Sequence, residues 1–139
     1  MTAEGPFMLQ PIGWTESALV SRDQAPNQGD EGAPDAWIAF DDAVSDGLHD
    51  LVVGSEVLFL TWLDRARRDV LRVRPRGDPN RPLTGVFSTR SPDRPNPIGL
   101  HRVTILAIDG TRIQVRNLEA LDGTPVVDLK PILDPICDR

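Results

Sequence analysis

The segment richest in groups that could bind a ligand runs from Gly85 to Leu100 and reads GVFSTRSPDRPNPIGL. It combines the polar side chains of Arg90, Arg94 and Asn96 with three prolines. Each proline fixes its own φ angle and restricts the residue before it, so we expect a stiff loop. A stiff loop can hold a ligand at little ordering cost. The alternative is a proline-rich turn whose arginines pair with surface carboxylates.

A second polar segment runs from Asp122 to Pro131 and reads DGTPVVDLKP. Asp128 and Lys130 are two positions apart, which places both side chains on the same face of a strand. A carboxylate and an ammonium there could orient an acceptor or take a proton. The alternative is an exposed ion pair, which contributes roughly a few tenths of a kcal/mol to stability.

A run of arginines in an otherwise acidic chain is the third candidate. The formal net charge of −6 argues against non-specific binding to a polyanion, but it allows a local basic patch. The run could bind phosphate groups or form a solvated basic edge, and its members are Arg65, Arg67, Arg68, Arg72, Arg74, Arg76 and Arg81. His101 could take a proton, although a half-buried strand histidine is the more common case.

Strand and turn signals dominate the rest of the chain. Ser55–Leu63 is β-branched, aromatic and continuous, as expected of a central strand. Val103–Ile108 and Arg112–Leu118 flank Asp109-Gly110, a pair that favours a tight hairpin. Further short strands are predicted at Phe7–Trp14, Ala36–Phe40, Val70–Arg74, Leu83–Thr89 and Val126–Leu129.

These elements define a fold class. Strands without long helices between them predict a mostly β protein, arranged as a compact antiparallel barrel or sandwich with long loops. We expect Asp42 to cap one short helix that carries Val44, Leu48 and Leu51 on one face. The Gly-x-Gly-x-x-Gly turn of doubly wound nucleotide-binding folds is missing from the sequence.

Length and composition limit the class further. The 139 residues fit one domain with a core large enough to fold unaided. The single cysteine, Cys137, makes no internal disulfide, and with two histidines it supplies too few ligands for a zinc cluster, so we expect no metal. Neither a secretory signal nor a stretch long enough to span a membrane is present, which with the cysteine usage predicts a cytoplasmic protein.

Both polar segments match motifs of a known family. Gly85–Gly99 and Asp122–Pro131, with weaker matches at Ile12-Gly13 and Pro26-Asn27-Gln28, resemble the TsaA/TrmO-like family. Its characterised members are S-adenosylmethionine (SAM)-dependent tRNA adenine-N6 methyltransferases. The resemblance implies a compact β-barrel methyltransferase that binds SAM near the interface of a homodimer. It also implies that the target is N6-threonylcarbamoyladenosine beside the tRNA anticodon. We expect residues 1–139 to form a single such domain, with no additional C-terminal domain.

The resemblance further implies roles for individual residues. Gln28 and Arg94 would face the acceptor, whereas Asp128 and Lys130 would orient the amine as the catalytic groups. The cofactor would contact a larger set from the two motifs, namely Arg90, Ser91, Asn96, Pro97, Ile98, Gly99, Leu100, Gly123 and Thr124.

Some features depart from the family pattern. The Ser-His-aromatic run common before the central strand is Ser55-Glu56-Val57-Leu58 here, and Ile132 replaces the tyrosine that usually follows Lys-Pro. These departures, together with the net charge of −6, favour an alternative acceptor, a small molecule that is nucleoside-like or derived from an amino acid. A binding module without activity is a third hypothesis, against which the near-intact motifs argue.

Overall fold

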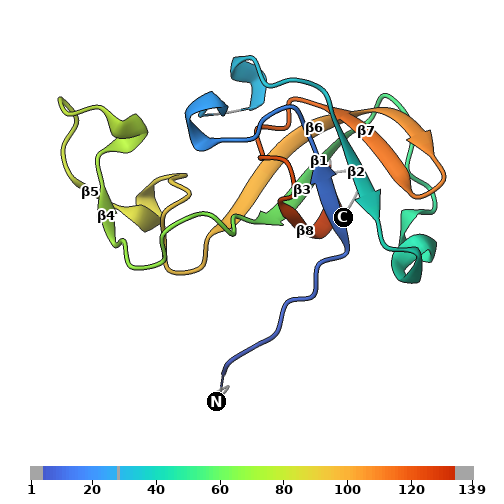
Figure 1. Ribbon diagram of the computed structural model, residues 1–139, viewed down its shortest axis with the longest axis horizontal. Coiled ribbons are helices and arrows are strands. Elements are labelled where there is room, and N and C mark those ends of the chain that lie inside the picture. Colours follow the sequence, from blue (N-terminus) through green and yellow to red (C-terminus); the bar gives the residue numbers. More distant parts are fainter. Residues whose placement is uncertain (1–4, 28, 134–139) are drawn as a thin grey trace.

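The computed structural model describes residues 5–27 and 29–133, and its centre is a closed β-barrel (Figure 1). The barrel strands follow the order β1-β2-β7-β6-β3-β8, and all neighbouring pairs are antiparallel. Their bounds are β1 Gly13–Glu16, β2 Ala36–Phe40, β3 Glu56–Trp62, β6 Ile98–Asp109, β7 Arg112–Arg116 and β8 Pro125–Pro131. The prediction of a compact antiparallel barrel is confirmed. Gln28 and Cys137 lie outside the described residues.

Alternating side chains fill the barrel. On β2, Ala36, Ile38 and Phe40 are buried while the residues between them are half-buried. The ring of Phe40 lies 6.2 Å from that of Phe59 on β3, a spacing typical of a favourable aromatic pair. Burial of each such side chain contributes about 1.5–3 kcal/mol. Because side chains fill the interior, ligand sites are left to the barrel ends and loops.

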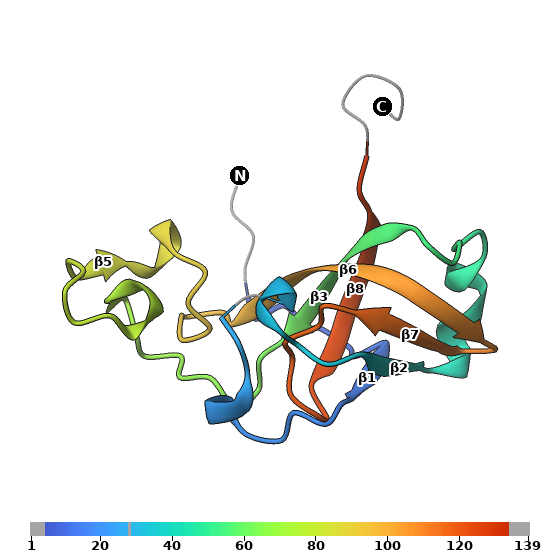
Figure 2. The same cartoon turned by 90° about the horizontal axis from the view of Figure 1, so that it is seen from above.

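Residues 64–97 leave the barrel between β3 and β6 and form a projection, called the arm below. Figures 1 and 2 show it to one side of the barrel in both views. The Leu63 N–H donates to the Pro97 carbonyl at 2.8 Å and closes its base. The arm holds a two-stranded sheet and two 3-10 helices, with bounds β4 Arg72–Val73, η4 Pro75–Gly77, β5 Thr84–Gly85 and η5 Val86–Ser88.

Arg68 fastens the two ends of the arm together. Its Nε donates to the Pro95 carbonyl at 2.7 Å, and its Nη2 donates to Asn96 Oδ1 at 3.0 Å. The same guanidinium lies over the Trp62 ring, 5.1 Å from the centroid, where a cation–π contact is favourable. The residues that lead into β6 are therefore held against the end of β3.

Three strand predictions show the largest errors in their bounds. The first strand begins at Gly13 instead of Phe7, consistent with Pro11 lacking a ladder donor, and Phe7 is exposed. Of the strand predicted over Leu83–Thr89, only β5 forms, because Val86 begins η5. Ile98–Leu100, expected in a loop, pair with β3 as the start of β6.

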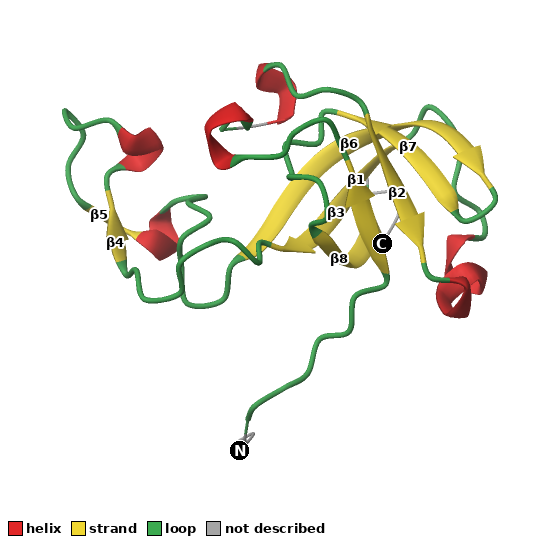
Figure 3. Cartoon of the chain, in the orientation of Figure 1, coloured by secondary structure: helices red, strands yellow, loops and turns green. Residues whose placement is uncertain are grey.

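The predicted short helix is present as the 3-10 helix η3, Asp42–Leu48. Its N-cap is Asp41 instead of Asp42, because the Asp41 side chain accepts from the Ala43 N–H at 3.0 Å. Val44, Leu48 and Leu51 pack against the core, as the spacing predicted. Figure 3 shows η3 at the end of the barrel away from the arm. It is not the only helix in the described residues, which also hold η4, η5, η1 (Arg22–Gln24) and η2 (Gly29–Glu31).

Candidate functional site

A cleft of 1090 Å³ lies where the arm meets the barrel. Its walls come from the arm, the first residues of β6, the loop between β7 and β8, and the segment around η1. The two motifs singled out in the sequence, far apart along the chain, thus meet at one cavity. The residues predicted to bind the cofactor that line it are Arg90, Ser91, Ile98, Gly99, Leu100 and Thr124.

Three residues predicted to contact the cofactor do not line the cleft, and each has a structural contact instead. Asn96 accepts a hydrogen bond from Arg68, and Pro97 is buried. Gly123 donates its N–H to the Thr15 carbonyl at 2.7 Å and has a φ of +81°, a conformation that favours glycine. These residues support the segments that form the cleft walls without lining the cleft themselves.

Arg94 lines the cleft, but its guanidinium serves the loop that carries it. Its Nη1 donates to the carbonyls of Thr89 and Ser91, both at 3.0 Å, and its Nη2 donates to Val86 at 3.0 Å. The structure therefore directs these donors at the chain's own backbone. Gln28, the other residue predicted to face an acceptor, lies outside the described residues.

Asp93 ties three parts of the cleft together. It accepts from the Arg67 backbone N–H at 2.9 Å and from Arg22 Nη2, in the η1 segment, at 3.1 Å. Burial would raise the pKa of the Asp93 carboxyl, but the Arg67 and Arg22 hydrogen bonds outweigh it and hold that pKa below its usual value. The ionised form of Asp93 is therefore the one that holds the arm and the η1 segment together.

A buried histidine connects the barrel to the cleft wall. The His101 side chain, on β6, places Nε2 2.6 Å from Thr61 Oγ1 and Nδ1 2.7 Å from Glu119 Oε1. Both His101 and Glu119 line the cleft. Gly99 lies against the His101 and Thr61 side chains, because a Cβ built there would lie 2.6 Å from His101 Nε2 and still closer to Thr61 Oγ1. The motif glycine is thus required by the packing of the barrel wall.

Sequence reasoning missed Thr61 and Glu119. The sequence signal at Glu119 is its place between two apolar residues, Leu118 and Ala120, which the fold buries. A carboxylate enclosed by core residues needs a partner, and here the partner is His101. His101, expected from the sequence to be half-buried, is instead buried, with 4% of its surface exposed.

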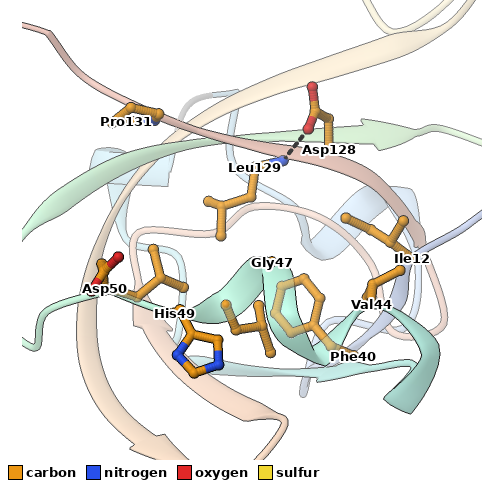
Figure 4. Close-up of a pocket in the computed structure, with 11 residues that line it drawn as sticks. Ile12, Phe40, Val44, Gly47, His49, Asp50, Asp128, Leu129 and Pro131 are labelled. Atoms are coloured by element: carbon orange, nitrogen blue, oxygen red, sulfur yellow. Dashed lines mark hydrogen bonds between the residues drawn. The ribbon is translucent and has the colours of Figure 1, made fainter.

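The structure does not bring Asp128 and Lys130 to this cleft. Lys130 Nζ lies 3.0 Å from Asp128 Oδ2, and both side chains are substantially exposed. Asp128 instead borders a second cavity of 410 Å³ beneath η3, whose wall is mainly apolar. Figure 4 shows Ile12, Phe40 and Leu129 around this cavity, and Asp128 accepts from the Leu129 N–H at 2.8 Å. The geometry matches the ion-pair alternative for these two residues.

Most members of the arginine run are engaged within the chain. Arg65 donates to the Val20 carbonyl at 2.7 Å, and Arg74 donates to that of Arg81. Other members pair with carboxylates of the arm or of η2, as in Arg67–Asp69, Arg81–Asp78 and Arg76–Glu31. Arg90, which is not part of this run, is exposed on the cleft wall and has no hydrogen-bond or ion-pair partner among residues 5–27 and 29–133.

Two further features are absent from the described residues. These residues include no group of three or more His, Cys, Asp or Glu side chains placed to hold a metal ion. No helix among them is both long enough and apolar enough to cross a membrane.

Comparison with known proteins gives consistent matches. A sequence model of the tRNA-methyltransferase O N-terminal domain matches residues 14–138. An S-adenosyl-L-methionine-binding protein of Archaeoglobus fulgidus is 46% identical over 124 residues, which cover 89% of this chain and 88% of the relative. A probable S-adenosyl-L-methionine-binding protein of Methanothermobacter thermautotrophicus is 42% identical over 128 residues, covering 92% and 91%.

Solved structures agree with the sequence matches. The crystal structure of TrmO from Pseudomonas aeruginosa superimposes with a TM-score of 0.73 at 26% identity. The match covers 97% of this chain but 61% of the TrmO chain, so this chain spans about three fifths of that protein.

Proposed function

The chain belongs to the family of the tRNA-methyltransferase O N-terminal domain, and we propose that it transfers a methyl group from SAM to N6 of threonylcarbamoyladenosine in tRNA. The observation that carries the proposal is the convergence of the Gly85–Leu100 and Asp122–Pro131 motifs on one cleft. We further propose that it acts in the cytoplasm as a homodimer. The assignment to SAM-dependent methyltransferases follows from the family, whereas the identity of the methyl acceptor is the additional claim of this proposal.

The residues of the cleft fit SAM. The cofactor combines an amino-acid zwitterion, a sulfonium and an adenosine group, so it needs a cation, an anion and apolar walls. The cleft offers the Arg90 guanidinium, the Glu119 carboxylate and the apolar side chains of Phe87, Ile98 and Leu100. Its volume of 1090 Å³ is slightly above the usual range for a small-molecule site, which leaves space for an acceptor beside the cofactor. When bound, SAM supplies a methyl group already activated by the sulfonium.

The chain contributes mainly by holding the two reactants. The prolines and Arg94 fix the loop at residues 86–97, so binding costs little ordering. Holding a donor and an acceptor in line can supply much of the acceleration of a displacement reaction. The acceptor nitrogen can lose its proton after attack, so the step does not require a strong base. Asp128 and Lys130 have no role in this proposal, because both side chains are outside the cleft.

Exposed apolar side chains on the arm support the homodimer. Leu71 is 63% exposed and Phe87 is 78% exposed, and Leu83 is also exposed. Exposed apolar patches of this kind favour association with another surface. Phe87 also lines the cleft, so a partner seated on the arm would complete the cofactor site.

A small-molecule acceptor is the second candidate. The observation that favours it is the state of the arginine run, because its guanidinium groups are directed largely at the chain's own carbonyls and carboxylates. Fewer arginines are then available for phosphates, and the net charge of −6 does not attract a polyanion.

Calorimetric titration tests the proposal. The protein is titrated with SAM and then with tRNA carrying threonylcarbamoyladenosine, and methylation of that nucleoside is measured by mass spectrometry. We expect SAM binding, methylated nucleoside, and tRNA affinity that falls as salt rises. SAM binding without methylation of any tRNA would favour the small-molecule acceptor, and absence of SAM binding would refute the assignment to methyltransferases.

A matched pair of variants locates the cofactor site. Arg90→Ala removes a cleft guanidinium that has no partner among the described residues, whereas Arg116→Ala removes an exposed arginine of β7 that does not line the cleft. Arg90→Ala should weaken SAM binding about tenfold or more, as expected on loss of a charge-assisted hydrogen bond. Arg116→Ala should leave the affinity unchanged. Equal affinities in both variants would move the cofactor away from Arg90.

A further inference from the structure

Glu119 lines the cleft and uses one of its two carboxylate oxygens for a contact with the barrel. Its Oε1 lies 2.7 Å from His101 Nδ1, and 18% of its side chain is exposed. Its second oxygen, Oε2, has no hydrogen-bond partner among residues 5–27 and 29–133. A half-enclosed carboxylate with open lone pairs on a cleft wall is suited to a ligand that donates hydrogen bonds.

The hydrogen-bonding capacities of the neighbours fix how Glu119 is held. A carboxylate only accepts, so His101 Nδ1 carries the proton and donates to it. The Thr61 hydroxyl, fully buried, lies 2.6 Å from Nε2 and holds the opposite side of the ring. In this arrangement both ring nitrogens of His101 have a hydrogen-bond partner. The Glu119 carboxylate is therefore held in one orientation, with Oε2 open among the described residues.

The other carboxylates on the cleft wall are not equivalent to Glu119. Asp93 is occupied by Arg22 and by the Arg67 backbone. Asp64 is exposed to solvent, where hydration weakens its interaction with any ligand. Glu119 is thus the one described carboxylate of the cleft that is partly buried, held in place and open on one oxygen.

We propose that Glu119 receives the ammonium group of the methionyl part of SAM, with His101 and Thr61 as positioning residues. The proposal rests on the cofactor of the proposed function and not on its acceptor. An ammonium offers three N–H donors, whereas the sulfonium offers none, so an acceptor-only carboxylate gains more from the ammonium. Arg90 on the same cleft supplies the opposite charge that the methionyl carboxylate requires.

Three ligands separate the possible contacts of Glu119. SAM carries the ammonium and the sulfonium, S-adenosylhomocysteine keeps the ammonium alone, and 5′-methylthioadenosine has neither. Each is titrated calorimetrically into the wild-type protein and into Glu119→Gln, which keeps an oxygen acceptor for His101 but loses the charge. Asp64→Asn is the matched control on the same cleft.

Glu119→Gln should bind SAM and S-adenosylhomocysteine about ten- to a hundredfold more weakly, with the affinity for 5′-methylthioadenosine unchanged. Asp64→Asn should match the wild type with all three ligands. A loss confined to SAM would place the sulfonium at Glu119, and a loss with all three would place the adenosine there, so either result overturns the proposal. Unchanged affinities would overturn it as well.

Thr61→Val provides a second route to the same conclusion. It retains Glu119 but removes the hydroxyl that orients His101, so a smaller loss with the same two ligands is expected. Losses that include 5′-methylthioadenosine would contradict a positioning role. If the wild type binds none of the ligands, the proposed function fails together with this inference. If the wild type binds but neither variant differs from it, only this inference fails.

Discussion

Gly99→Ala tests the packing of the barrel wall directly. A Cβ at position 99 would lie 2.6 Å from His101 Nε2 and closer still to Thr61 Oγ1, well inside normal contact. Thr61 is fully buried and His101 nearly so, so neither side chain can swing away into solvent. Overpacking of this kind costs about 1–3 kcal/mol. The intruding methyl group should also displace His101 and with it Glu119, so SAM affinity should fall.

A double-mutant cycle with Thr61→Ala separates this clash from a general loss of stability. Thr61→Ala alone leaves His101 Nε2 without its partner, which costs about 1–3 kcal/mol. In the double variant the missing hydroxyl gives the new methyl group room. The combined loss should therefore be smaller than the sum of the single losses, by roughly 0.5–3 kcal/mol.

The assay is denaturant unfolding of the four proteins, with the free energy taken from midpoints at a common m value. A Gly99→Ala variant within about 0.5 kcal/mol of the wild type would refute the argument, because that is the range of an inconsequential surface change. Strictly additive losses would refute it too, since they would show that the alanine does not meet Thr61.

Two other variants test the supports of the cleft. Arg94→Lys cannot bridge three carbonyls as the guanidinium does, so limited proteolysis should cut the loop at residues 86–91 faster than in the wild type; equal rates would contradict this role. Asp93→Asn removes a carboxyl whose pKa is lowered on folding, so its stabilisation is present above about pH 3.9 and lost as the pH falls through the lower folded value. Unfolding at pH 7 and near pH 3 should show a difference from the wild type that shrinks in acid, and a constant difference would count against it.

Much of the barrel could be predicted because its signals are local. Ala36–Phe40 was predicted with its observed bounds, and the Asp109-Gly110 pair forms the hairpin between β6 and β7. Alternation of buried residues and a two-residue turn depend on neighbours in the chain. The start of β6 was missed because Pro97 suggested a loop, whereas it precedes the strand and leaves the ladder intact.

The site was predictable only in part, for a reason of topology. The motif residues Arg90, Ser91 and Leu100 line the cleft, because a contiguous motif shapes a contiguous wall. Glu119 is 18 positions from His101, and the two meet because β6 pairs with β7 and the chain then turns back across the barrel end. No spacing rule in the sequence encodes that meeting, so the carboxylate with an open oxygen was found only in the folded chain.

The arginines of the arm supply hydrogen-bond donors that its prolines lack. Every proline adds a carbonyl acceptor to the chain without an N–H donor, so a proline-rich loop has more acceptors than its backbone can satisfy. A guanidinium has five donors, and Arg94 alone serves three carbonyls while Arg68 serves that of Pro95. The loop is therefore stiff because its surplus carbonyls are bound, and the arginine run, predicted either to bind phosphate or to form a solvated edge, mostly serves the arm itself.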